Sequence, residues 1–298
     1  MGYLLIFVMI LIYTGQTFFC KLYSDKYPGQ SDMASPVFSV VSASAVALVT
    51  FIWSGFRFSF DPLILLLGVI NAAIIFSYNY VLIATSRRGP YSVLSVFNAS
   101  GGILVPIIVA VVFRDFNHWK WFVIAFILLA VYLVSAKKQE GSTKTEPSFF
   151  LFCPLLAAVN GSYGAMLDLQ KRLTEQGLTG DSGKGEMLII TYTCVALASL
   201  IFGFIKRKGR FVGDFKQTKL SFAFLLISSA CTAVAANLLT TLLEGGLVNN
   251  TTLLTFKQSG ILVFSVLASC LFLKEKLSLK NILGIVLMCA GLVTLSFM

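Results

Sequence analysis

The strongest constraint on this chain is a series of long apolar stretches that carry almost no charge. A helix that crosses the hydrocarbon core of a membrane needs about 20 apolar residues, and it satisfies its own backbone groups there. The sequence therefore predicts an all-α integral membrane protein with ten transmembrane helices. The predicted spans are Gly2–Cys20, Met33–Phe56, Pro62–Ser86, Gly89–Phe113, Trp121–Ala136, Pro147–Leu167, Met187–Ile205, Leu220–Leu243, Gly245–Leu273 and Asn281–Met298.

The composition agrees with a membrane protein. The chain is 57% hydrophobic and only 12% charged, whereas a soluble domain carries about 25% charged residues. The formal net charge of +10 does not indicate a nucleic-acid partner, because the basic residues lie in short connections between spans and not on one surface. Basic residues in such places contact lipid headgroups. Membrane lipid is therefore an expected partner, and nucleic acid is not.

The ten predicted spans fall into two halves. A polar linker, residues 137–146 (KKQEGSTKTE), separates the first five from the second five, and Gly102–Val105 in the fourth span recurs as Gly260–Val263 in the ninth. We interpret this pattern as an internal repeat, with one five-helix unit over residues 1–140 and another over 141–298. Because each unit has an odd number of helices, the two enter the membrane in opposite directions and form inverted repeats of one transport domain.

Enzymatic and metal-dependent functions find no support in the sequence. The six cysteines lie within or beside apolar spans without a C-x-x-C pair, and His118 is the single histidine. Such cysteines are typical of buried free thiols. Neither G-x-S-x-G nor H-E-x-x-H occurs. We therefore expect a protein that is not an enzyme and that uses no metal or other cofactor.

Several features resemble a known superfamily of transporters. Lys21 and Lys171 close the first helix of each half, and the turn Phe272–Leu277 leads into a last helix that contains Gly284 and Gly291. Together with the five-plus-five arrangement, these features resemble the drug/metabolite transporter superfamily, and within it the EamA-like family. The first half departs from the pattern, because Arg114-Asp115-Phe116 stands where a glutamate is usual and Tyr132 stands near the counterpart of Gly291.

The resemblance implies a fold and an activity. The fold would have ten helices in an inverted repeat around a central cavity, lined mainly by helices one to four and six to nine. The activity would be proton-coupled efflux or solute exchange, so protons or a counter-substrate are expected partners besides a small-molecule solute. The protein is expected in the plasma membrane or the bacterial inner membrane.

The orientation of the termini stays open. With a cytoplasmic amino terminus, the cytoplasmic loops would hold six basic residues and the opposite loops sixteen, including those of the segment Lys206–Arg210. Since basic residues concentrate in cytoplasmic loops, the charges favour an external amino terminus. The family usually has both termini in the cytoplasm, and we prefer that arrangement by a small margin.

Lys257 is the most informative single residue, because it lies near the centre of the ninth span. A lysine at the centre of a membrane costs about 2.5–3.5 kcal/mol on insertion scales, so it is expected to face a cavity or a partner. Three roles remain open. Its ammonium group could bind an anionic group of the solute, form a structural ion pair with Glu244 or Asp168, or take part in proton coupling.

Polar side chains at helical spacing predict the walls of the cavity. For each amide, a hydrogen bond between helices is an equal alternative. The candidate solute-binding residues are Lys257, Asn98, Asn79, Tyr78, Asn160, Tyr163, Asn237 and Gln16.

The fourth span contains Gly101, Gly102 and Pro106. Small residues allow close helix packing and proline bends a helix, so these three form a candidate hinge, with a static kink as the alternative.

The leading hypothesis is a secondary active transporter of a small polar or anionic metabolite that works by alternating access. Two alternatives are an exporter of amino acids or amphipathic drugs, in which the lysine is structural, and a lipid-handling flippase. The identity of the solute and the oligomeric state do not follow from the sequence.

Overall fold

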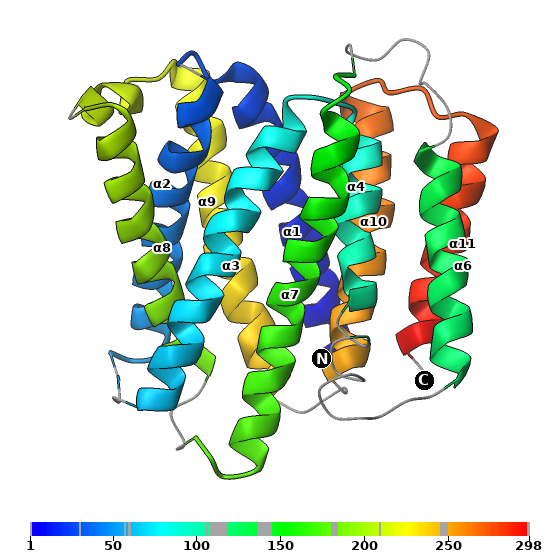
Figure 1. The fold of residues 1–298 in the computed structure, drawn as a ribbon, viewed down its shortest axis with the longest axis horizontal. Helices are drawn as coiled ribbons and strands as arrows, with labels where there is room; N and C mark the ends of the chain where they lie inside the picture. The colour runs from blue at the N-terminus through cyan, green and yellow to red at the C-terminus, as the bar shows by residue number, and fades with distance from the viewer. Residues whose placement is uncertain are drawn as a thin grey trace.

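The apolar stretches form helices that lie side by side in one bundle (Figure 1). The computed structural model describes residues 2–29, 31–56, 58, 61–104, 107, 118–135, 145–179, 184–208, 210–244 and 250–296. Its α-helices are α1 (Gly2–Lys26), α2 (Ala34–Trp53), α3 (Pro62–Ser86), α4 (Tyr91–Ser100), α6 (His118–Ser135), α7 (Phe149–Glu175), α8 (Lys184–Lys206), α9 (Lys219–Glu244), α10 (Asn250–Phe272) and α11 (Leu279–Ser296). Three 3-10 helices join them, η1 (Ser31–Met33), η2 (Gly101–Ile103) and η3 (Arg210–Phe215).

Several of these helices can cross a membrane. Within the described residues, six are long and apolar enough, namely Tyr3–Lys26, Ala34–Trp53, Pro62–Ser86, Phe149–Glu175, Gly185–Lys206 and Lys219–Leu243. Shorter apolar helices cover Phe122–Val134, Phe256–Phe272 and Leu279–Thr294. An all-α membrane protein is thus confirmed. The count of ten crossings, the inverted repeats and the division at residue 140 stay predictions.

Local sequence explains where α3 begins. The Asp61 side chain accepts hydrogen bonds from the backbone N–H groups of Leu63 and Ile64, at 2.8 and 3.3 Å. Pro62 is the first helical residue, where its missing N–H group costs nothing. The polar residues before the third apolar stretch therefore define its start.

The fourth helix changes geometry in its middle. After Ser100 the α-helix tightens into η2, which contains the two glycines of the candidate hinge. A Cβ atom on Gly101 would lie 2.7 Å from the carbonyl oxygen of Ala157 and 2.9 Å from the nitrogen of Gly161, so α4 and α7 approach each other closely there. Pro106 lies outside the described residues. Whether this segment acts as a hinge stays a prediction.

Helices far apart in the sequence pack against each other. Helix α1 packs on α9, and α3 packs on α7. Helix α2 contacts α8 and α9, while α3 also contacts α8. Helix α4 packs on α10, and α6 packs on α11. Figure 1 shows α6 and α11 together at one edge of the bundle.

The two ends of the bundle differ. Both chain termini lie at the same end, which we call the terminal end (Figure 1). The opposite end holds residues 21–29, 31–33, 87–90, 206–208, 210–219 and 273–280, and we call it the basic end because many of these residues are Lys or Arg. Ion pairs join its segments, Lys206 with Asp32 at 2.9 Å and Arg207 with Asp214 at 2.7 Å.

Candidate functional site

A polar cavity lies in the centre of the bundle, between α1–α4 and α7–α10. These correspond to helices one to four and six to nine, which the resemblance implies. The cavity has about 600 Å³ of empty space, including the part that opens to solvent. The lining residues are Tyr13, Gln16, Thr17, Ser42, Ile75, Tyr78, Asn79, Asn98, Asn160, Tyr163, Tyr192, Thr232, Ala236, Lys257, Gln258 and Ile261.

Lys257 is the one ionically charged side chain among these lining residues. It is only 4% exposed, and its Nζ atom lies 4.7 Å from the centre of the Tyr13 ring. Within the part of the chain that the structure describes, no carboxylate pairs with it. Asp168, one of the two structural partners predicted for this lysine, instead bonds Arg172 at 2.9 Å. The side chain of Glu244, the other, is outside the described part.

Two asparagines at the cavity wall, Asn98 and Asn160, differ in the hydrogen bonds of their side chains. The Nδ2 atom of Asn160 donates a hydrogen bond to the backbone carbonyl of Asn98 at 2.6 Å. This carbonyl belongs to the last turn of α4, where the helix tightens, so Asn160 on α7 supports α4 at that point. The Oδ1 atom of Asn98 is buried and has no hydrogen-bond partner in the described structure. Its capacity to accept a hydrogen bond is therefore unused within the described structure.

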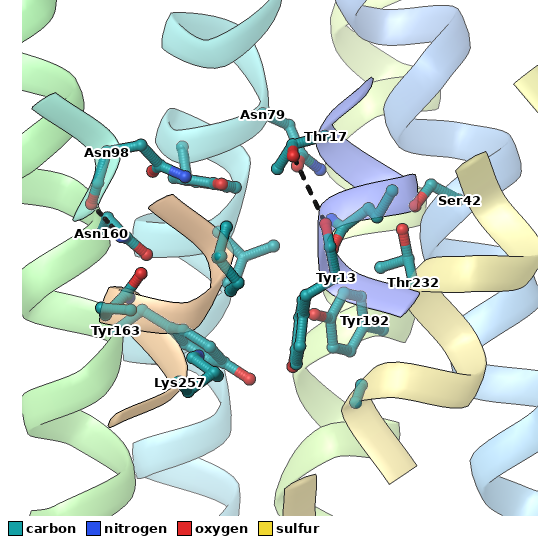
Figure 2. Close-up of a pocket in the computed structure, with 16 residues that line it drawn as sticks. Tyr13, Thr17, Ser42, Asn79, Asn98, Asn160, Tyr163, Tyr192, Thr232 and Lys257 are labelled. Carbon is teal, nitrogen blue, oxygen red and sulfur yellow. Dashed lines mark hydrogen bonds between the residues drawn. The ribbon is translucent and has the colours of Figure 1, made fainter. Parts of the chain in front are cut away.

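Hydroxyl groups complete the polar lining. Figure 2 shows Tyr192 and Thr232 facing Tyr163 and Lys257 across the space. The two sides come from different helices, α8 and α9 on one side and α7 and α10 on the other, while Tyr13 of α1 contacts Lys257. A solute between them would meet aromatic rings, hydroxyl groups and one cation. Such a surface suits a small polar molecule with a negative group.

Seven of the eight candidate solute-binding residues line the cavity, namely Lys257, Asn98, Asn79, Tyr78, Asn160, Tyr163 and Gln16. The eighth, Asn237, is not among the lining residues. Its Nδ2 atom donates to the Thr50 hydroxyl at 3.0 Å and to the Ala233 carbonyl at 2.8 Å. Asn237 therefore joins α9 to α2. Binding of a solute by the other seven stays a prediction.

Sequence reasoning missed part of the lining, mainly hydroxyl-bearing residues. The residues outside the predicted set are Tyr13, Thr17, Ser42, Ile75, Tyr192, Thr232, Ala236, Gln258 and Ile261. A signal was present for three of them, because Tyr13 shares a helix face with Gln16 and with Thr17, and Gln258 is an amide next to Lys257. The remaining Ser, Thr and Tyr residues had none, since a single such residue in an apolar helix commonly bonds its own backbone or lies at the lipid interface.

Comparisons with known proteins agree with this architecture. Residues 176–297 match the model of the EamA-like transporter family. Twenty-five chains of known structure also match. One of these, a crystal structure of a protein, has a TM-score of 0.61 and 11% sequence identity, and the match covers 99% of this chain and 98% of that one. At this identity it shows a shared fold alone. No curated protein sequence matches the chain.

The family match indicates a general class for the protein. EamA-like proteins are integral membrane transporters of small molecules, and this chain has several helices that can span a membrane. The match to a transporter family favours a transporter of small molecules as the general class. Residues 176–297 of this multi-pass integral membrane protein are thus similar to the EamA-like transporter family.

Proposed function

We propose that this protein is a secondary carrier for a small polar solute with a negative charge, bound in the central cavity at Lys257. The carrying observation is that this lysine is the one charged residue in the lining and has no carboxylate partner among the described residues. A lysine in the membrane is expensive and is by default functional. An anionic solute would supply the missing counter-charge.

The nature of the lining supports this solute class. Asn98 offers an unpaired amide oxygen, and Gln16, Asn79 and Gln258 add further amide groups at the wall. A solute that carries both a negative group and hydrogen-bond donors would satisfy the lysine and the amide oxygen together. A purely apolar solute would leave both unpaired, which costs binding energy.

The helix contacts support alternating access by two inverted repeats. In the proposed repeats, α1, α2, α3, α4 and α6 correspond in that order to α7, α8, α9, α10 and α11. A contact between α1 and α9 should then have a counterpart between α7 and α3, and both contacts occur. Likewise α2 with α9 becomes α8 with α3, and both occur. The cavity lies between the proposed repeats, where rocking of one against the other would expose it alternately to each side.

A thermal-shift screen with matched pairs of compounds tests the proposal. Each pair consists of a small acid and its neutral amide, so that size and shape stay nearly constant while the charge changes. A ligand that binds only the folded state raises the apparent melting temperature. We expect shifts from certain acids and none from their amides.

The hits are then tested with Lys257→Gln and with Lys171→Gln as the matched control. Lys171 lies at the end of α7, pairs with Glu175 at 3.5 Å and is outside the cavity lining. Shifts that persist in the control and vanish in Lys257→Gln support the proposal. Equal shifts from acids and amides, or shifts that survive in Lys257→Gln, would instead favour the neutral or amphipathic solutes of an exporter. Exchange of the hit across liposomes then shows whether a proton or a counter-solute drives transport.

A further inference from the structure

Three helices meet just beyond the cavity, on the side of the basic end. Tyr91, the first residue of α4, is fully buried there. Its hydroxyl group lies 2.7 Å from the Thr17 hydroxyl of α1 and donates to the Ser265 hydroxyl of α10 at 3.1 Å. Phe18 packs against this junction, with its ring centre 5.9 Å from that of Tyr91 and 5.5 Å from that of Phe272.

These hydroxyl groups form the boundary of the cavity. Thr17 itself lines the cavity. Tyr91 precedes the lining residue Asn98 by seven residues on α4, and Ser265 follows the lining residue Gln258 by seven on α10. Residues seven apart lie on the same face of a helix, about 10 Å apart along its axis. The junction thus lies above the cavity on the same faces that line it.

A carboxylate from the second half of the chain binds the first residues of α4 at this junction. Glu275 follows α10, and its two carboxylate oxygens accept hydrogen bonds from the backbone N–H groups of Tyr91 at 2.7 Å and Ser92 at 3.0 Å. The first N–H groups of a helix have no partner within the helix, and Pro90 supplies no side-chain cap. A negative charge at a helix N-terminus forms strong, charge-assisted bonds.

The backbone after α10 aims this carboxylate. Lys274 has φ of +54°, a left-handed conformation that turns the chain sharply after the helix. The N–H group of Glu275 then donates to the carbonyl of Ser269 at 3.2 Å, which ties the turn back onto α10. Glu275 therefore moves with α10, while the N–H groups that it binds belong to α4.

We propose that Glu275 is a latch that keeps the cavity closed toward the basic end, together with the Thr17–Tyr91–Ser265 hydroxyl cluster. Every one of these bonds except Thr17 to Tyr91 joins the first half of the chain to the second. Opening this end of the cavity requires α4 and α10 to separate, which breaks both carboxylate bonds at once. The inference rests on the proposed alternating-access function, but it uses no residue of the solute site except Thr17.

A native cysteine can report the opening. Cys20 lies one turn beyond Thr17 on α1, is fully buried and belongs to the apolar cluster that contains Tyr91 and Leu94. We would treat purified protein, without any solute, with N-ethylmaleimide and follow modification of each cysteine by peptide mass spectrometry. Cys153 on α7 is equally buried and serves as an internal control for general loosening of the fold.

The variant is Glu275→Ala, with Glu146→Ala as the matched control. Glu146 is an exposed carboxylate that pairs with Arg88 at 3.3 Å and accepts a hydrogen bond from the Ser148 hydroxyl. We expect Cys20 to react about tenfold faster in Glu275→Ala, since a lost charge-assisted hydrogen bond changes an opening equilibrium by at least this factor. Cys153, and both cysteines in Glu146→Ala, should keep the wild-type rate.

A second variant tests the hydroxyl cluster. Tyr91→Phe keeps the buried ring and removes both of its hydroxyl bonds, so Cys20 should react faster by a smaller factor than in Glu275→Ala. An unchanged rate at Cys20 in Glu275→Ala would overturn the latch, and so would an equal rise at Cys20 and Cys153, which means general unfolding. Because no solute is present, either result leaves the anionic site at Lys257 untouched, and failure of that site would leave the labelling result intact.

Discussion

The ammonium group of Lys257 lies 4.7 Å from the centre of the Tyr13 ring, so α10 and α1 meet inside the cavity through a cation–π contact. Tyr13 belongs to the first half of the chain and Lys257 to the second. The contact places the single cation of the lining at the boundary between the halves (Figure 2). A bound anion would share the ammonium group with the ring, so the ring positions the lysine for the solute.

Two substitutions of Tyr13 distinguish the contribution of its ring to stability from that of its hydroxyl group. Tyr13→Phe keeps an aromatic face for Lys257 and should leave stability nearly unchanged. Tyr13→Leu removes the face and should lower the free energy of unfolding by roughly 2 kcal/mol, the value of a desolvated cation–π contact. Thermal unfolding in detergent measures both. Equal losses in the two variants would mean that the hydroxyl group, and not the ring, holds the lysine.

The two adjacent glycines of η2 should respond differently to alanine. In Gly101→Ala the new methyl group would lie 2.7 Å from a backbone oxygen and 2.9 Å from a backbone nitrogen of α7, so the two helices must separate. We expect a loss of about 1–3 kcal/mol, as for other overpacked sites. In Gly102→Ala the nearest atom is Cγ of the Gln258 side chain at 3.2 Å, which can shift. Melting temperatures that fall equally in both variants would contradict the close approach of α4 and α7.

Asn237 should matter for stability and not for solute binding. Its bond to Thr50 joins α9 to α2, and Asn237 is not among the lining residues. Asn237→Leu should lower stability by about 0.6–2 kcal/mol, the range for hydrogen bonds between membrane helices. The affinity for any solute found in the screen should stay at the wild-type value. A loss of affinity for the solute in a variant that melts at the wild-type temperature would instead show that Asn237 takes part in solute binding.

The ion pair at the basic end predicts a dependence on pH. A hydrogen bond from Lys206 holds the pKa of Asp32 below its usual value. Since the folded-state pKa is lowered, the pair contributes stability above the ordinary Asp pKa of about 3.9 and loses it as the pH falls through the lowered value. Asp32→Asn should therefore melt at a lower temperature than wild type at neutral pH. The loss in free energy of unfolding should be less than about 1 kcal/mol, because both side chains are partly exposed.

The same comparison at a pH below the lowered pKa of Asp32 supplies the control, because the carboxylate is then protonated in both the folded and the unfolded state. The two melting curves should approach each other there. High salt at neutral pH should also narrow the difference through screening. If wild type and Asp32→Asn differed in melting temperature by the same amount at both pH values, the effect would come from packing of Asp32 and not from its charge.

The membrane fold was predictable because a transmembrane helix depends on an apolar run about 20 residues long, which a single sequence displays directly. The position of Lys257 in the cavity was predictable for a related reason, since burial of an unpaired cation is expensive anywhere else. Asn98 and Asn160 followed from their helical spacing with other polar groups.

The partners of these residues were not predictable, because they lie on other helices. Asn237 has the same chemistry and a similar spacing, but α2 supplies Thr50 opposite it, so it forms a bond between helices. Tyr192 and Thr232 face the cavity only because of how α8 and α9 rotate in the bundle. The contact of Glu275 with α4 likewise depends on residues 184 positions apart in the chain.

The central claim, that Lys257 binds an anionic group of the solute, is tested most directly by equilibrium binding. Isothermal titration would compare wild type and Lys257→Gln for the acid that gives the largest thermal shift. The account predicts at least about a tenfold loss of affinity for the acid in Lys257→Gln, equivalent to about 1.4 kcal/mol, with the variant still folded and the amide of the acid bound weakly by both proteins. Equal affinity of the two proteins for the acid would contradict it.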